Sequence, residues 1–382
     1  ETHVHFHAAN GRQVVALGPP EQVMAEGEST TARFLSGREK IEIPAARRRV
    51  KKTQRLVLEG VTTNNLHEVD VAFPLGLLVC ITGVSGSGKS SLVNETLARA
   101  LIRRLGGAAP RPGAFRSLRG VSGVSKVVAV DQTPIGRSPR SNPATFVGAW
   151  DEIRKVFAAT REAKQRGFRA SRFSFNVKTG RCEECQGQGW KRIEMNFLPD
   201  LLVPCGACGG RRFNRQTLQV HYRGKTIADV LDMPIDEAAA FFENYAAIHR
   251  PLASLCESGL GYLHLGQPSS TLSGGEAQRV KLAAELARPT QGNALYLLDE
   301  PTTGLHFEDI CRLLAVLHQL VEAGNSVMVI EHHLDVIKCA DWVIDLGPEG
   351  GSGGGRLVAE GTPEEIAAVE ESHTGRFLRE VL

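Results

Sequence analysis

The sequence lacks any long apolar run and any strong excess of one charge. Within its 382 residues, no apolar stretch approaches the roughly 18–20 residues that a membrane-spanning helix needs, so we expect no membrane span. Lysine and arginine number 45 against 42 aspartates and glutamates, which gives a net charge of +3. This excess is too small for a protein that binds nucleic acid over its whole surface. Any DNA-binding surface must therefore be a local patch.

The chain also lacks an initiator methionine and a secretory signal. It starts at Glu1, without the charged and then apolar segments of a signal peptide. This start predicts a cytoplasmic protein and suggests that the chain is truncated. Hydrophobic residues at 42% and charged residues at 23% are ordinary globular values, and the length predicts two or three domains.

A segment near the start of the chain is repeated near its end. Residues 15–35 align without a gap with residues 358–378, at an offset of 343 positions and with 12 identities in 21. The second copy closes a domain, so we predict that residues 1–40 are the end of a preceding half whose body is absent. Residues 41–54 contain Pro44 and many arginines and lysines, which predicts a solvated basic linker.

A glycine-rich segment is the first candidate site. Short apolar runs between residues 56 and 81 predict strands, and the last of them leads into GVSGSGKS, from Gly83 to Ser90. Residues with helical apolar spacing follow. Backbone N–H groups of such a loop bind phosphates, its lysine neutralises the β- and γ-phosphates, and its serine holds Mg²⁺. The residues predicted to bind the nucleotide here are Gly83, Ser85, Gly86, Gly88, Lys89, Ser90 and Ser91.

Two further apolar runs end in charged residues. Residues 294–298 precede Asp299 and Glu300, and residues 327–330 precede Glu331 and His332. An aspartate at a strand end is typical of a Mg²⁺ site, and the adjacent glutamate can orient or deprotonate the attacking water. We predict that Asp299 belongs to the nucleotide site. Glu300 is predicted to be catalytic, and His332 could sense the γ-phosphate.

The sequence LSGGE, residues 272–276, opens a predicted helix with Ser273 as N-cap and Glu276 three positions later. The order and spacing of all these motifs resemble the ABC ATPase family. The resemblance implies that Gln132 is a catalytic Q-loop residue and His332 the switch histidine. It also implies that two ATPase domains enclose two ATP molecules, so that the signature residues contact the nucleotide of the other domain. These signature residues are Ser273, Gly274 and Gly275.

In such a family one half alone cannot complete an ATP site. We therefore expect this chain to pair either with a second copy of itself, as a homodimer, or with the absent N-terminal half.

Four of the eight cysteines form two C-x-x-C pairs. Cys182 and Cys185 are separated by 19 residues from Cys205 and Cys208. This spacing is typical of a metal site rather than of a disulfide framework. Four thiolates predict a closed tetrahedral Zn²⁺ site, whose role is structural because no coordination position stays open for a substrate.

Basic residues are concentrated around these cysteines. Residues 150–215 contain 14 lysines and arginines against 7 acidic residues. Such a patch would bind DNA phosphates with an affinity that depends on salt but not on base sequence. An ordinary solvated surface is the alternative on charge alone. The candidate DNA-binding residues are Arg169, Arg172, Lys178, Arg181, Lys191, Arg192, Arg211 and Arg212.

The residues around the cysteines narrow the resemblance to the UvrA family of damage-recognition ATPases. The similar segments include RFSFNVKTGRCEEC at residues 172–185, DQTPIGRSPRSNP at 131–143 and GLGYLHLGQP at 259–268. The resemblance covers nearly all of residues 12–382. It implies the C-terminal half of an ATP-hydrolysing protein of nucleotide excision repair, whose zinc hairpin engages damaged double-stranded DNA. UvrB would bind through the absent first half.

The expected fold is α/β, an ABC-type P-loop ATPase core with a helical, zinc-binding insertion. The core parts are predicted at residues 55–145 and 266–382, and the insertion at 146–265 with its zinc hairpin at 182–208. Two alternatives remain open. The chain could be a UvrA-like paralogue in drug resistance or stress response, or a DNA-binding half with a silent ATPase. A transporter subunit is disfavoured because no membrane span is present.

Overall fold

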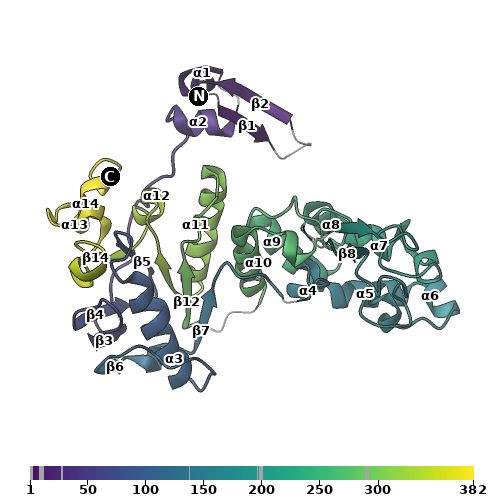
Figure 1. Ribbon diagram of the computed structural model, residues 1–382, viewed down its shortest axis with the longest axis horizontal. Coiled ribbons are helices and arrows are strands. Elements are labelled where there is room, and N and C mark those ends of the chain that lie inside the picture. The colour runs from purple at the N-terminus through teal and green to yellow at the C-terminus, as the bar shows by residue number, and fades with distance from the viewer. Residues whose placement is uncertain are drawn as a thin grey trace. The chain divides into compact units, whose positions relative to one another are not determined.

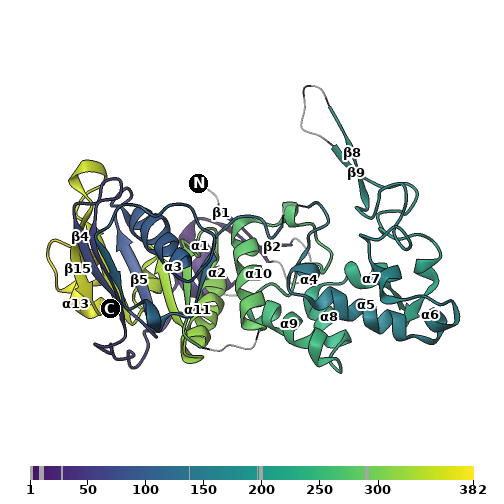
Figure 2. The same ribbon diagram turned by 90° about the horizontal axis from the view of Figure 1, so that it is seen from below.

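The computed structural model describes residues 3–7, 13–26, 29–136, 138–195, 197, 201–288 and 292–382. The chain divides into two compact units, of which the first combines residues 1–132 with 289–382 and the second contains residues 133–288. Figures 1 and 2 show the elements of both units in two views. Within the described ranges, no helix has the length and apolar character needed to cross a membrane. The domain boundaries predicted from the sequence stay predictions.

The first unit is built on a six-stranded sheet in the order β15-β14-β5-β13-β12-β7. All neighbouring strands are parallel except β15, which runs antiparallel to β14. Their bounds are β5 (Leu78–Gly83), β7 (Lys126–Val130), β12 (Ala294–Asp299), β13 (Ser326–Ile330), β14 (Trp342–Gly347) and β15 (Arg356–Gly361). Strands β5 and β13 are buried almost throughout, as continuous apolar runs in a parallel sheet should be. The carboxyl ends of β5, β12 and β13 therefore meet at one edge.

A second, antiparallel sheet in the order β4-β3-β6 completes the core of this unit. It consists of β3 (Arg55–Val61), β4 (Val69–Pro74) and β6 (Ser117–Arg119). Its buried side chains, such as Leu56 and Phe73, pack in one hydrophobic cluster with Ile81 of β5 and Met328 of β13. Helix α11 (Phe307–Glu322) buries residues at helical spacing, among them Ile310 and Leu314. The strands predicted from apolar runs are thus present.

The repeated sequence is also a repeated structure. Ser29 and Ser372, which lie 343 positions apart, both serve as N-caps and accept a hydrogen bond from the backbone N–H three residues later. A strand and two short helices occur in the same order in both copies. The first copy is β2 (Gln13–Gly18), α1 (Pro20–Glu26) and α2 (Thr30–Leu35), and the second is β15, α13 (Pro363–Ala367) and α14 (His373–Leu378). Strand β1 (His3–His7) pairs antiparallel with β2.

The basic run at residues 41–54 is exposed at most of its positions, and two of its arginines are bound by acidic side chains. Ile41 is buried. The Arg47 guanidinium donates to the Lys338 carbonyl at 2.9 Å and pairs with Glu364 at 2.5 Å. Arg48 pairs with the buried Asp341 at 3.0 Å. Side-chain contacts of this kind, which composition does not reveal, hold Arg47 and Arg48 against their own unit.

The second unit is mainly helical. Its core contains clustered aromatic side chains, including Trp150, Phe157, Phe173, Phe175 and Phe213. The helices are α4 (Pro143–Phe146), α5 (Ala149–Ala159), α6 (Arg161–Gln165), α7 (Ile227–Leu231), α8 (Ile235–Phe241), α9 (Ala246–Glu257) and α10 (Gly274–Leu286). The strands are β8 (Trp190–Ile193), β9 (Leu201–Pro204), β10 (His221–Tyr222) and β11 (Lys225–Thr226), in two hairpins.

Candidate functional site

The glycine-rich loop follows β5 directly. Gly83 has φ +129°, and a Cβ there would lie 2.0 Å from the Leu346 carbonyl oxygen, so the position requires glycine. The Lys89 ammonium donates to the carbonyl oxygens of Gly83 and Val84 at 2.8 and 2.9 Å. Burial lowers the pKa of Lys89, while nearby carboxylates such as Glu300 oppose the shift. Phosphate oxygens could replace the two carbonyls and form stronger, charge-assisted hydrogen bonds with this lysine.

The helix after the loop starts in an uncommon form. Residues Ser91–Ala98 form a π-helix, which α3 (Arg99–Arg104) continues. The Thr96 hydroxyl donates to the Ser91 carbonyl five residues earlier, at 2.7 Å, and this bond fits the wider turn. The exposed Ser90 makes no capping hydrogen bond with its side chain, so its hydroxyl is available to a Mg²⁺ ion. π-Helical turns are frequent at functional sites, but apolar spacing does not predict them.

One cavity joins the loop to the ends of the other strands. The residues that line it are Asn65, Gly83, Ser85, Gly86, Gly88, Lys89, Ser90, Ser91, Glu300 and His332. All seven nucleotide-binding residues predicted in the loop are among them. Asp299, at the end of β12, accepts a hydrogen bond from the Asn94 amide at 2.7 Å. Burial raises the pKa of Asp299, with a further contribution from Glu300.

The three predicted catalytic residues lie close together. The Gln132 amide donates to the Glu300 carbonyl at 3.2 Å, and the His332 Nδ1 atom lies 3.8 Å from the Glu300 carboxylate. Glu300 has φ +43°, a left-handed conformation that is strained in a non-glycine residue and that clusters at functional sites. Its backbone N–H donates to the Ile330 carbonyl at 2.9 Å, and this bond joins the end of β12 to the end of β13. The roles of these residues stay predictions.

The signature motif lies in the second unit. Ser273 caps α10 as predicted, because its hydroxyl accepts from the Glu276 N–H at 3.2 Å and its own N–H donates to the Glu276 carboxylate at 2.7 Å. The Tyr262 hydroxyl donates to the same carboxylate at 2.6 Å. Ser273 is exposed, while Gly274 and Gly275 are half-buried. This leaves the start of α10 accessible to a ligand or a second domain.

The four predicted metal ligands converge. The sulfur atoms of Cys182, Cys185, Cys205 and Cys208 all lie within 4.8 Å of one another. The Cys185 and Cys208 sulfurs are 3.7 Å apart, close to the separation of about 3.8 Å implied by tetrahedral Zn–S bonds of about 2.3 Å. Burial raises the pKa of the Cys208 thiol to about 12. A bound cation is the means by which such a thiol becomes a thiolate, so the residues fit Zn²⁺.

The structure divides the predicted DNA-binding residues by exposure. Arg172 and Arg181 are half-buried, and Arg172 stacks on Phe168 at 4.5 Å and donates to Gln216 at 2.8 Å. Arg212 is only 7% exposed and donates to the Gly266 carbonyl at 2.7 Å, so its guanidinium belongs to the interior. The residues on the surface are Arg169, Lys178, Lys191, Arg192 and Arg211. Lys191 forms an ion pair with Glu184.

Comparisons with known proteins agree on one family. UvrABC system protein A of Mycobacterium bovis is 58% identical over 373 residues, and that of Bacillus subtilis is 56% identical over the same length. Each alignment covers 98% of this chain. The crystal structure of UvrA2 from Deinococcus radiodurans superimposes with a TM-score of 0.91 at 51% identity, over 97% of this chain. The chain is therefore similar to UvrA proteins over nearly its whole length. No protein-family model matches it.

The similarity concerns one part of each UvrA protein. The chain spans 38% of the Mycobacterium protein, 39% of the Bacillus protein and 44% of the Deinococcus chain. The expected α/β fold, with an ABC-type ATPase core and a helical insertion that carries the cysteines, is confirmed. The match to the UvrA family is confirmed as well. The internal repeat remains the reason to place this part in the C-terminal half.

Sequence reasoning missed a buried carboxylate in this chain. Glu331 is fully buried at the end of β13. One of its oxygens accepts from the N–H and hydroxyl of Thr302 at 3.1 and 2.6 Å, and the other accepts from the N–H groups of His332 and His333 at 2.8 and 3.0 Å. Glu331 therefore fixes the backbone shortly after Glu300 and at His332 and His333. No local signal distinguishes this glutamate from an ordinary charged residue after a strand.

A glycine-rich loop near the C-terminus was missed as well. The Gly351 N–H donates to the Gly86 carbonyl at 3.1 Å, and the Asn65 amide bridges the carbonyls of Gly86 and Gly351 at 2.9 and 3.0 Å. A Cβ on Gly350 would lie 2.5 Å from the Ser85 carbonyl, so side chains are excluded where the two loops meet. The run GGSGGG at residues 350–355 is visible in the sequence, but only the fold shows that it supports the phosphate loop.

Proposed function

We propose that this chain binds and hydrolyses ATP and couples that reaction to the binding of damaged double-stranded DNA in nucleotide excision repair. The observation that carries the proposal is the single cavity that joins the phosphate loop to Glu300 and His332. Its support outside the cavity is the identity of 56–58% with UvrABC system protein A of two organisms.

Each residue has a role in this proposal. Backbone N–H groups of the loop and Lys89 hold the phosphates, and Ser90 and Asp299 hold Mg²⁺ directly or through water. Glu300 orients or deprotonates the attacking water, and Gln132 and His332 contact the reacting γ-phosphate region. The strained backbone of Glu300, fixed by its bond to Ile330, keeps its carboxylate beside His332.

The ATP site becomes complete only when a second signature motif covers it. The chain contains one phosphate loop and one signature, and Ser273 is exposed at the start of α10. We infer that Ser273, Gly274 and Gly275 bind the nucleotide of another ATPase domain, either in a second copy or in the N-terminal half. A chain without either partner would bind ATP and hydrolyse it slowly or not at all.

The zinc-binding cysteines and the exposed cations form the DNA-binding part of the proposal. Zn²⁺ at the four cysteines is structural and holds the β8–β9 hairpin in place. Lys178, Arg192 and Arg211 are exposed in this region and would neutralise DNA phosphates. Recruitment of UvrB is assigned to the other half of the protein. DNA as the substrate also implies that the protein works in the cytoplasm.

Turnover measured against protein concentration tests the ATPase proposal. If two copies complete each other's sites, the rate per chain rises with concentration and then saturates at the dimer. A rate per chain that stays constant down to nanomolar concentrations would contradict the shared site. Tight ATP binding without turnover at any concentration would favour the DNA-binding half with a silent ATPase.

Binding to lesion-bearing and undamaged duplexes, with ATP and at two salt concentrations, tests the DNA proposal. We expect tighter binding to the lesion, and we expect the double variant Cys205→Ser, Cys208→Ser to lose this preference. The matched control is Arg211→Met, which should reduce the salt dependence by about one phosphate contact on both duplexes. Equal binding of the wild-type chain to both duplexes would limit its role to general DNA binding.

A further inference from the structure

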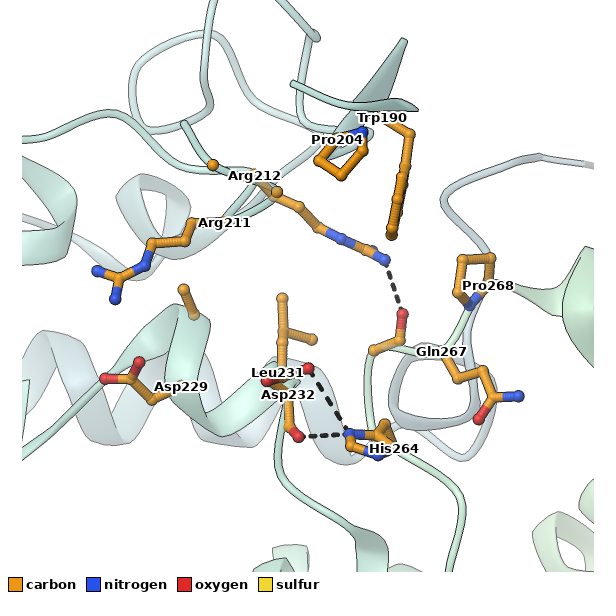
Figure 3. A pocket seen from close by; sticks show the side chains of 14 residues that line it. Trp190, Pro204, Arg211, Arg212, Asp229, Leu231, Asp232, His264, Gln267 and Pro268 are labelled. Carbon is orange, nitrogen blue, oxygen red and sulfur yellow. Dashed lines mark hydrogen bonds and ion pairs between the residues drawn. The ribbon is translucent and has the colours of Figure 1, made fainter. Parts of the chain in front are cut away.

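Arg212 connects the metal site to another part of the second unit. We use the name zinc module for residues 181–213, whose ends are joined by a bridge between Arg181 and Phe213. A cavity lies between this module and the chain at residues 228–232 and 264–268. Figure 3 shows the Arg212 side chain extending across it beneath Trp190, with its hydrogen bond to the Gly266 carbonyl drawn as a dashed line. This bond of 2.7 Å joins residues 54 positions apart.

The backbone of Arg212 is fixed by both cysteine pairs. Its carbonyl accepts from the Cys182 N–H at 2.9 Å. The N–H of the neighbouring Arg211 donates to the Cys208 carbonyl at 3.0 Å. Arg212 has φ +67°, a left-handed conformation that an arginine adopts only when its surroundings impose it. The direction of the side chain therefore depends on the geometry of the cysteine cluster.

Gly266, which accepts the hydrogen bond from Arg212, lies shortly before the signature motif. Gly266 donates its N–H to the Leu231 carbonyl at 2.7 Å, and a Cβ there would lie 2.9 Å from that oxygen. Seven positions later the chain reaches Ser273. The segment between them is tied down by a bond from the Ser269 N–H to the Ser141 carbonyl at 2.8 Å. A displacement of Gly266 would therefore reach the start of α10 through only seven residues of chain, which hydrogen bonds hold in place.

Stability alone does not account for a buried arginine here. The Nη1 atom of Arg212 is buried and has no hydrogen-bond partner among the residues that the structure describes. A buried cation with an unsatisfied donor costs free energy, and an apolar side chain of similar volume often serves stability better. The guanidinium is instead suited to hold one specific carbonyl at a fixed position.

We propose that Arg212 is a positioning residue that transmits the state of the zinc site to the segment leading into Ser273, Gly274 and Gly275. This inference rests on the proposed function, in which that motif acts on the ATP of a second ATPase domain. The zinc module would then influence ATP hydrolysis through the hydrogen bond between Arg212 and Gly266 as well as through DNA binding.

Hydrogen exchange of the whole chain tests the link without any need for turnover. In the zinc-loaded protein with Arg212→Met, we expect amides between Leu265 and Ser273 to exchange at least tenfold faster than in the wild type. The matched control is Arg211→Met, which removes the exposed neighbour and should leave this segment unchanged. One zinc per chain and a cooperative melting transition show that the variant is folded. Unchanged exchange in such a folded variant overturns the proposal.

Chelation of zinc from the wild-type chain gives a second test that does not depend on the folding of a variant. We expect it to accelerate exchange in the same segment, and an unaffected segment overturns the proposal. If Arg212→Met also lowers kcat while the KM for ATP is kept, and Arg212→Lys restores part of kcat, the positioning role is supported. Suppose that chelation accelerates exchange between Leu265 and Ser273 in a wild-type chain that shows no ATP turnover. This result would support the connection between the zinc site and the signature segment and would contradict the proposed ATPase function.

Discussion

The two candidate sites are held in place by different means. The nucleotide site is assembled from the ends of β5, β12 and β13, whose strands lie in the interior of a six-stranded sheet. The zinc module has a buried cluster that consists of its cysteines alone, and all residues of β8 are exposed to solvent. The nucleotide site is therefore supported by a large hydrophobic core. The zinc module depends on its metal because it has almost no core of its own.

The largest effect should come from removing zinc ligands. Structural Zn²⁺ sites bind with apparent free energies of about 10–16 kcal/mol, and that binding energy is folding energy. The double variant Cys205→Ser, Cys208→Ser should lose zinc and the protection of amides in β8 and β9. Protection in β5 and β13 should stay. Zinc stoichiometry and hydrogen exchange measure this, and a hairpin that stays protected without metal would break the contrast between the sites.

The next largest effect should come from Glu300→Gln. This change removes the carboxylate that is proposed to activate water, and general-base catalysis typically contributes about 10²–10⁴-fold. We expect turnover to fall by that factor while ATP affinity is kept, because Lys89 and the loop are unchanged. Single-turnover kinetics and nucleotide titration measure the two quantities. Hydrolysis close to the wild-type rate would exclude Glu300 from the role proposed for it.

A smaller effect is expected from Glu331→Gln. The substituted amide can accept from only one of the two groups of donors that the carboxylate now serves, so buried N–H groups lose a partner. The unfolding free energy should fall by about 1–3 kcal/mol. Turnover should fall as well, because His332 loses its anchor, while zinc content should stay the same. Thermal or denaturant unfolding measures the change, and an unaltered midpoint would mean that this carboxylate is not the support inferred from its contacts.

The smallest effect concerns pH at Asp299. Burial raises its pKa above the ordinary value of 3.8, and the Asn94 amide opposes this shift. Its contribution to stability is thus present below pH 3.8 and is lost as the pH rises through the raised pKa. Mg²⁺ needs the ionised form, so Mg²⁺-dependent nucleotide affinity should fall as the pH falls towards that pKa, by at most about tenfold per pH unit.

The variant Asn94→Leu sharpens this test. It removes the hydrogen bond that favours the carboxylate, so the loss of Mg²⁺-dependent affinity should begin at a higher pH than in the wild type. Nucleotide titrations across the acidic range, with zinc content as the control for the other unit, measure the shift. The same pH midpoint in both proteins would show that Asn94 has no influence on Asp299.

Much of the nucleotide site could be predicted from local patterns. Buried parallel strands appear as continuous apolar runs, and functional side chains follow them at their carboxyl ends. For this reason the sequence pattern assigns Lys89, Glu300 and His332 to one site, and the three residues do line one cavity. The spacing of the two cysteine pairs predicted the metal cluster in the same way.

Other features depend on neighbours that are distant in the sequence. Arg211 and Arg212 are adjacent and identical in type, yet one is exposed and the other is buried against Gly266. Arg47 looks like part of a solvated basic run, but Glu364 and two backbone carbonyls bind it. Charge alone therefore predicted a basic region without showing which of its cations are free to bind a ligand.

The sequence by itself determined the chemistry of this chain: a phosphate loop, a carboxylate after a buried strand, a capped signature helix and four thiolates. Each of these signals consists of short patterns of neighbouring residues, so local geometry carries it. The tertiary structure alone decided that Glu331 anchors the catalytic segment, that a glycine loop supports the phosphate loop and that Arg212 faces inward. Burial and hydrogen bonding between distant segments set these roles, because a side chain's environment is fixed only when the whole core has formed.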